Sequence, residues 1–196
     1  ISTLSLTQLK KEALAVPALY SIGDSTTKNS GHPSGYDPAT STDHRTYGSW
    51  GNCVTAEMYD GVFSSYSNHG MAGRNSSSFY NEGRLEAVLL SIAPGDYVTV
   101  NMGINTDKSG AEPYEQLMEY YYVQGIIQRG GIPVILTHTP QNPVGNYVGN
   151  YDAATGTFNC SRAGDGRVEF LRSLATKYEL DLIDIGKWGN DFFNSL

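Results

Sequence analysis

The chain has 196 residues and a mass of 21.3 kDa, the size of one ordinary domain with its own hydrophobic core. Hydrophobic residues make up 39% and charged residues 17%, which excludes a disordered chain. No apolar run approaches the ~18–20 residues that span a bilayer. The formal charge of −7 repels phosphate backbones, and no basic stripe offsets it. We therefore expect neither nucleic acid nor a membrane as a partner.

The two cysteines, Cys53 and Cys160, permit one disulfide and exclude a zinc site built from cysteines. Whether they pair stays open at this point, because pairing depends on geometry. The chain begins with Ile rather than Met. Either a cleaved secretion signal or an artificially chosen start of the sequence would explain this. Residues 75–77 and 159–161 fit the N-glycosylation pattern. These features favour a secreted, extracellular protein.

The apolar pattern predicts strands that alternate with helices after an N-terminal leader over residues 1–17. Short apolar runs that end at glycine or polar residues indicate strands, and apolar residues at helical spacing indicate helices. In chain order, the expected elements are a strand over 18–22, a helix over 47–59, a strand over 63–69, a helix over 82–91, a strand over 97–102, a helix over 113–129, a strand over 133–137, a helix over 166–177 and a strand over 182–185. Two long polar loops are expected, over 26–46 and 140–162, and loops of this length often serve function.

This alternation favours an α/β fold, a three-layer α/β/α sandwich around a five-stranded parallel sheet, in one domain over residues 18–196. In such sheets, ligands bind outside the carboxyl ends of the strands. The residues that directly follow each strand are therefore the candidates for chemistry.

Three residues that follow successive predicted strands have side chains or backbone suited to acyl transfer: Ser25, Gly73 and Asn105. A serine is a nucleophile when a base takes its proton. A glycine N–H and an asparagine carboxamide can both donate to an oxyanion. Each residue also has an ordinary structural explanation, as a capping serine, a tight turn and a turn asparagine. Their common place at one sheet edge favours the catalytic interpretation.

The segments around these residues, in their order and spacing, resemble the SGNH (GDSL-type) hydrolases, and more closely their rhamnogalacturonan acetylesterase branch. The segments that carry the resemblance are LYSIGDST at 19–26, NHGMAGRNSSSF at 68–79, EGRLEA at 82–87, PGDYV at 94–98, GIN at 103–105 and TPQNP at 139–143. The resemblance implies a flavodoxin-like sandwich, which in this chain is expected to lack its final helix, with Ser25 as the nucleophile. It also implies an oxyanion hole made of the backbone N–H groups of Ser25 and Gly73 and the side chain of Asn105.

The sequence departs from the family pattern around Asn105. Ile104 stands where the family usually has His or another polar residue, and Thr106 stands where it usually has Asp, with Asp107 one position further on. These differences affect the shape of the loop and the fit of substrate more than the oxyanion role of Asn105.

A larger departure concerns the general base, which the family takes from an Asp-x-x-His block after the fifth strand. The tail over residues 188–196 contains no histidine, and Asp191 is followed by Phe, Phe and Asn. Of the four histidines present, His138 is the best-placed substitute, because it follows the fourth predicted strand. His32, His44 and His69 are expected to be structural or solvated.

Three explanations of the missing block stay open. The final helix and its Asp-x-x-His lie on a separate C-terminal fragment, the sequence is truncated, or the protein is a non-catalytic relative that keeps a sugar-binding cleft. We favour the first two, because a protein that only binds sugar needs none of the three catalytic candidates.

The sequence thus predicts a carboxylic ester hydrolase, a carbohydrate acetylesterase that removes acetyl groups from a plant cell-wall polysaccharide such as rhamnogalacturonan. The base would come from outside this chain, and no cofactor fingerprint or metal-ligand cluster is visible. The alternative is a carbohydrate-binding relative that has lost its base. A lipase or thioesterase of the same superfamily is disfavoured by the polar loops. The sugar, the acyl group and the oligomeric state stay open.

Overall fold

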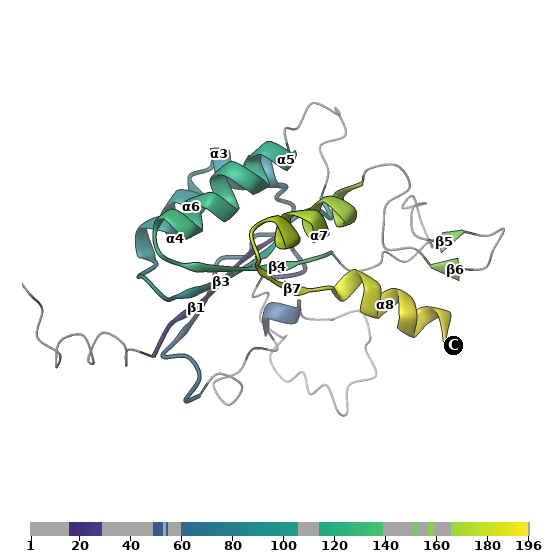
Figure 1. Cartoon of the computed structure of the whole chain (residues 1–196), viewed down its shortest axis with the longest axis horizontal. Coiled ribbons are helices and arrows are strands. Elements are labelled where there is room, and N and C mark those ends of the chain that lie inside the picture. Colours follow the sequence, from purple (N-terminus) through teal and green to yellow (C-terminus); the bar gives the residue numbers. More distant parts are fainter. Residues whose placement is uncertain are drawn as a thin grey trace, which may run out of the picture.

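The computed structural model describes residues 16–28, 49–52, 54, 60–105, 114–138, 151–152, 157–158 and 166–195. A five-stranded parallel sheet lies at its centre (Figure 1). The strands are β1 (Leu19–Gly23), β2 (Tyr66–Asn68), β3 (Tyr97–Asn101), β4 (Ile132–Leu136) and β7 (Asp181–Ile183), in the spatial order β2-β1-β3-β4-β7. A short antiparallel pair, β5 (Tyr151–Asp152) and β6 (Thr157–Phe158), forms a second sheet. The predicted fold class is confirmed.

The strand order places the candidate site residues together. β1 is hydrogen-bonded to β2 on one side and to β3 on the other. The order in which successive strands join the sheet therefore switches from one side of β1 to the other. The carboxyl ends of the three strands are aligned, because Ser21 pairs with Asn68 and Gly23 pairs with Asn101. Such a switch point is where doubly wound sheets bind ligands. The segments after β1, β2 and β3 therefore share one edge of the sheet.

The helices cover the sheet unequally. They are α3 (Ser76–Asn81), α4 (Arg84–Ser91), α5 (Tyr114–Gln116), the π-helical segment η2 (Leu117–Val123), α6 (Gln124–Gln128), α7 (Arg167–Lys177), α8 (Ile185–Asn194) and the 3₁₀ turn η1 (Trp50–Asn52). The helices from α3 to α7 lie over one face, and η1 lies on the other side (Figure 1). None of the described helices is long and apolar enough to cross a bilayer.

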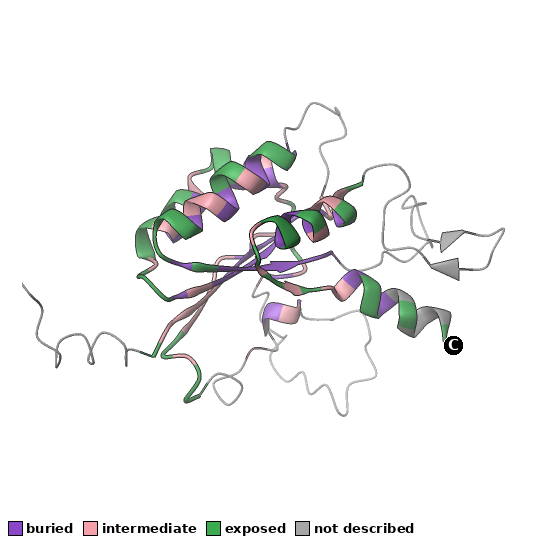
Figure 2. Ribbon diagram, viewed as in Figure 1, coloured by how far each residue is buried: buried purple, intermediate pink, exposed green. Residues whose placement is uncertain are grey.

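The core lies between the sheet and the layer of α3 to α7 (Figure 2). Fully buried side chains from the strands meet fully buried side chains from the helices: Ile22, Val98, Val100 and Ile135 from the strands, and Phe79, Val88, Met118, Tyr122, Ile126 and Leu171 from the helical layer. Burial of each large apolar side chain stabilises the fold by about 1.5–3 kcal/mol. This packing holds the sheet edge that carries the candidate site.

The predicted helix over 113–129 is present, but its middle is π-helical. Its buried pairs, 117–118 and 122–123, are five residues apart, whereas an α-helix repeats its buried face every three or four. The wider turn keeps both pairs on the sheet side. Tyr122 is also held by its hydroxyl, which donates to the carbonyl oxygen of Ser76 at 2.8 Å.

Two helices were not predicted. α3 has a polar sequence, and it begins at a capping box in which the Asn75 side chain accepts from the Ser78 N–H at 2.7 Å while Ser78 Oγ accepts from the Asn75 N–H at 3.0 Å. α8 forms from the tail after β7, where the sequence led us to expect no final helix, and Asp184 caps it by accepting from the Lys187 N–H at 3.0 Å.

Some other boundaries differ from the prediction. β2 covers 66–68 instead of 63–69, and β7 ends at residue 183 because residue 185 already begins α8. In the predicted helix over 47–59, the structure describes the 3₁₀ turn at 50–52. Residues 1–15 of the leader, both cysteines, His32, His44 and the segments 29–48 and 139–150 lie outside the described residues.

Candidate active site

Ser25 lies at the first turn after β1. The chain turns sharply here, because the N–H groups of Thr27 and Lys28 both donate to the carbonyl oxygen of Asp24, at 3.2 and 2.8 Å. Ser25 is exposed at the top of this turn, whereas Asp24 beneath it is only 1% exposed. The predicted nucleophile is thus accessible at the carboxyl edge of a central strand.

The Asp24 carboxylate holds the turn from inside. Its Oδ1 accepts from the Thr26 N–H at 2.8 Å and from Thr26 Oγ1 at 2.9 Å. Burial raises the pKa of Asp24, and the hydrogen bonds from Thr26 offset only part of that effect. A charged group at this position therefore costs stability, although it fixes the backbone that presents Ser25.

Asn101, the last residue of β3, joins the turn over residues 24–28, which contains Ser25, to its neighbours. Its Oδ1 accepts from Thr27 Oγ1 at 3.2 Å and from the Trp50 indole N–H at 3.2 Å, and it shares with Asp24 the one hydrogen of Thr26 Oγ1, which lies 2.9 Å away. Its Nδ2 donates toward the carbonyl oxygens of Leu136, the last residue of β4, and Thr137. Asn101 was not among the residues predicted from the sequence, although an asparagine that ends an otherwise apolar strand is a usable signal.

Replacing Asn101 by leucine is expected to lower the free energy of unfolding by about 2–5 kcal/mol, since each buried donor left unsatisfied costs roughly 1–3 kcal/mol. Urea denaturation measures the loss. Asn81→Leu on the exposed side of α3 is the matched control and should change stability little. Equal stability of the two variants would contradict the role given to Asn101.

The loop after β2 packs directly on the turn over residues 24–28. The Met71 N–H donates to the Gly23 carbonyl oxygen at 2.9 Å, and Asn68 Nδ2 donates to the Thr27 carbonyl oxygen at 2.7 Å. A Cβ atom on Gly70 would lie 2.6 Å from the Lys28 nitrogen, so a glycine is needed for this close approach. These contacts fix the start of the loop that carries Gly73.

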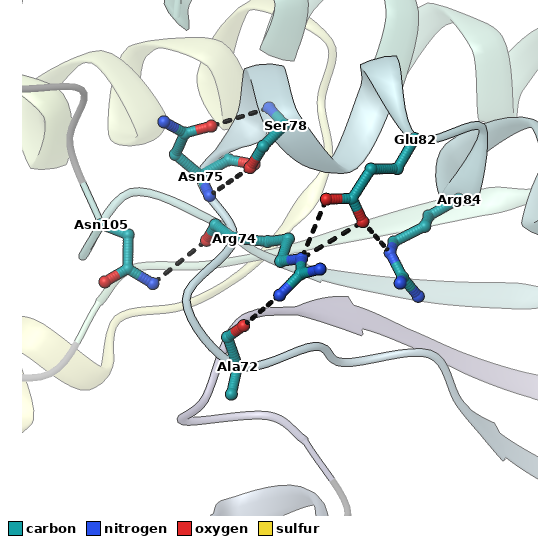
Figure 3. A network of polar contacts seen from close by, with 7 residues as sticks. All are labelled: Ala72, Arg74, Asn75, Ser78, Glu82, Arg84 and Asn105. Atoms are coloured by element: carbon teal, nitrogen blue, oxygen red, sulfur yellow. Dashed lines mark hydrogen bonds and ion pairs between the residues drawn. The ribbon is translucent and has the colours of Figure 1, made fainter.

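Gly73 and Asn105 are brought together. Gly73 is exposed, with a left-handed φ of 76°, and Asn105 follows β3. The Asn105 Nδ2 donates to the carbonyl oxygen of Arg74 at 3.1 Å, one residue after Gly73 (Figure 3). The carboxamide nitrogen has two hydrogens, and this bond uses one of them. Ser25 lies on the same edge, since the β2 loop contacts both its turn and Asn105. The catalytic roles of the three residues stay predictions.

The two described histidines are held in packed positions. His138 follows β4 and is 3% exposed, next to Gly103, where an added Cβ would lie 3.4 Å from the His138 Cδ2 atom. His69 stacks on Tyr20 with ring centroids 6.0 Å apart, and its Nε2 lies 2.9 Å from Ser67 Oγ. Burial lowers the pKa of His69. A role for His138 as the base has no support in these contacts.

The raised pKa of Asp24 predicts a pH-dependent stability difference in Asp24→Asn. Because the pKa in the folded state lies above its unfolded value, protonated Asp24 contributes stability at low pH that is lost as the pH rises through the folded pKa. The asparagine variant should therefore be the more stable protein at neutral pH, and this advantage should vanish below the ordinary carboxyl pKa of 3.8. Urea denaturation over a pH series measures it. A stability gap that does not change with pH would contradict the assignment.

No protein-family model matches the chain. The probable rhamnogalacturonan acetylesterase YesY of Bacillus subtilis is 29% identical over 126 residues, covering 61% of this chain and 52% of that protein. The rhamnogalacturonan acetylesterase RhgT of the same organism is 31% identical over 91 residues, covering 45% of this chain and 38% of that protein. The chain thus spans about half the length, or less, of these curated relatives.

Among solved structures, a catalytic mutant of Axe2, an acetylxylan esterase from Geobacillus stearothermophilus, superposes with a TM-score of 0.63 at 14% identity, over 93% of this chain and 82% of that chain. Catalytic mutants of Axe2 replace a serine, an aspartate and a histidine, and the last two are three positions apart. The resemblance seen in the sequence is confirmed: the chain has the fold of an SGNH-type α/β hydrolase, and its homologues include rhamnogalacturonan acetylesterases.

Proposed function

We propose that this chain carries the nucleophile and the oxyanion hole of a secreted serine esterase that removes acetyl groups from a plant cell-wall polysaccharide. Rhamnogalacturonan is the first candidate substrate, because the relatives include a rhamnogalacturonan acetylesterase and a probable one. The observation that supports the chemistry is an exposed serine just after β1, at the sheet edge where Asn105 binds the loop that carries Gly73.

In the proposed reaction, Ser25 Oγ attacks the acetyl carbonyl carbon while a base takes its proton. The N–H groups of Ser25 and Gly73 and the carboxamide of Asn105 donate to the resulting oxyanion. The intermediate collapses, the C–O bond to the sugar breaks, and the sugar hydroxyl leaves with the proton from the base. Water then attacks the acetyl-serine by the same route and releases acetate. Donors held in place before the reaction need no reorganisation in the transition state.

The base in this proposal comes from outside the chain. The sequence contains no Asp-x-x-His block. In Axe2, an aspartate and a histidine with that spacing are the sites of catalytic mutants. The proposal therefore assigns the base to a histidine on a separate C-terminal segment, which approaches Ser25 at the exposed sheet edge.

Acetate release from acetylated rhamnogalacturonan, with acetylated xylan and a long-chain p-nitrophenyl ester as comparisons, tests the proposal in the complete protein. We expect rapid release from a polysaccharide and slow cleavage of the long-chain ester. An active-site phosphonate should label Ser25, which peptide mass spectrometry locates. Labelling at another residue with undiminished activity would overturn the proposal.

The absence of an Asp-x-x-His block from the sequence favours a second candidate, a carbohydrate-binding relative without a base. The same experiment separates the two. Retained binding of the polysaccharide in a sedimentation assay, without release of acetate and without labelling of Ser25, would support the binding protein.

A further inference from the structure

The turn that presents Gly73 spans residues 71–74. The Arg74 N–H donates to the Met71 carbonyl oxygen at 3.3 Å, and Gly73 has a φ of 76° at the third position. Among the described residues, Glu179 is the one non-glycine with a positive φ, so Ala72 has an ordinary negative φ. This combination defines a type II turn. A type I turn would flip the middle peptide and point the Gly73 N–H to the opposite side.

The guanidinium of Arg74 holds that middle peptide. Its Nη1 donates to the Ala72 carbonyl oxygen at 3.0 Å (Figure 3). In a trans peptide, the carbonyl of Ala72 and the N–H of Gly73 point in opposite directions. Holding the carbonyl therefore sets the direction of the N–H. A charged donor on the carbonyl also polarises the peptide and strengthens that N–H as a donor.

The backbone of Arg74 holds the second proposed donor. Its carbonyl oxygen accepts from Asn105 Nδ2 at 3.1 Å, which orients the carboxamide on the same loop (Figure 3). One residue thus contacts both groups that the proposed oxyanion hole takes from outside the turn over residues 24–28.

Glu82 keeps the guanidinium in this position. The Arg74 Nε lies 3.1 and 3.2 Å from its two carboxylate oxygens, and Arg84 binds the same carboxylate from the other side. These bonds from Arg84 and Arg74 lower the pKa of Glu82. The side chains are about one third exposed, and exposed ion pairs add little to stability. The ion pairs with Glu82 are therefore better explained by the orientation that they give to the Arg74 guanidinium than by a contribution to the stability of the fold.

We propose that Arg74, held by Glu82, is a positioning residue for the oxyanion hole: its guanidinium fixes the Ala72–Gly73 peptide and its carbonyl fixes Asn105. This inference rests on the proposed esterase function. Arg84 supplies a matched comparison, because it binds the same carboxylate as Arg74 and the structure gives it no bond to the turn.

Steady-state kinetics of the complete enzyme on p-nitrophenyl acetate tests the inference. Arg74→Gln is expected to lower kcat by about 10- to 100-fold, somewhat less than the loss of a whole oxyanion donor. KM should stay within about twofold of the wild-type value, since Arg74 positions groups that act on the transition state. Arg84→Gln should keep the wild-type kcat. Arg74→Lys, which retains the charge but not the forked geometry, should fall between the two.

Amide NMR gives a readout that does not depend on turnover. In Arg74→Gln, the Gly73 N–H and the Asn105 side-chain resonances should shift, and in Arg84→Gln they should stay in place. If Arg74→Gln does not fold, Glu82→Gln releases the guanidinium while keeping Arg74, and should give the same shifts and the same drop in kcat.

The outcomes separate this inference from the proposed function. Full activity of Ser25→Ala would defeat the esterase mechanism, and the NMR comparison would still decide whether Arg74 holds the turn. If Ser25→Ala is inactive while Arg74→Gln and Arg84→Gln match the wild type in kcat and in the Gly73 resonance, the positioning role of Arg74 is wrong.

Discussion

Ser25→Ala in the complete protein is expected to lower kcat for ester hydrolysis by at least about 10⁴-fold, the scale seen when a catalytic serine is removed. The loss follows from chemistry, because a methyl group cannot form the acetyl intermediate. Ser25 is exposed, so the fold should be unaffected. Acetate release measures the rate, and thermal unfolding checks the fold.

Ser64→Ala is the control for this substitution, since Ser64 is an exposed serine just before β2. It should retain the wild-type kcat. A Ser25→Ala protein that keeps a tenth or more of the wild-type rate would show that another group attacks the ester.

Asn105→Ala is expected to reduce kcat by about 10²–10³-fold, the cost of one oxyanion donor. The carboxamide bonds the Arg74 carbonyl at 3.1 Å, so the variant also loosens the 71–74 turn, and part of the decrease comes from the Gly73 N–H. KM should change little, because the donor acts mainly on charge that develops in the transition state.

Asn105→Asp tests the electrostatic role of the carboxamide, because both replacements lose the bond to the Arg74 carbonyl and the aspartate also adds a negative charge. A carboxylate in place of the carboxamide cannot donate and repels the oxyanion, so kcat should fall at least as far as in Asn105→Ala. Asn81→Ala, on the exposed surface of α3, should be fully active. A rise in KM with unchanged kcat in Asn105→Ala would assign Asn105 to substrate binding rather than to the oxyanion.

The site depends on groups that reduce stability. Asp24 is 1% exposed, and its raised pKa shows that burial disfavours its charged form. Gly73 lies in the left-handed region, where an added Cβ would meet no atom of the described residues within 4 Å, so strain rather than crowding opposes a larger residue there. The Asn101 contacts hold the turn that contains Asp24, and the Arg74 side chain holds the Ala72 carbonyl that precedes Gly73. Stabilising substitutions at these positions are therefore expected to reduce activity.

The sequence pattern predicted the sheet well because its central strands are short apolar runs. β1, β3 and β4 are buried along most of their length, so their boundaries agree with the prediction within one residue. β2 is a half-buried edge strand, and its predicted span was too long. α3 has a polar sequence that gives no amphipathic signal. Its start depends instead on the capping box at Asn75.

The amino-acid order was enough to place Ser25, Gly73 and Asn105 at one edge of the sheet, because parallel strands end on the same side and local apolar runs mark where each strand stops. The amino-acid order alone did not predict the contacts that shape the site. Asn101 binds Thr26 and Thr27, which lie 75 and 74 positions earlier in the chain. Asn105 binds a carbonyl oxygen 31 positions earlier. Such bonds depend on how the strands align and how the loops pack. No local pattern of side chains predicts contacts between residues so far apart in the sequence. Local physics therefore determined which residues follow each strand, and long-range packing determined which of them touch.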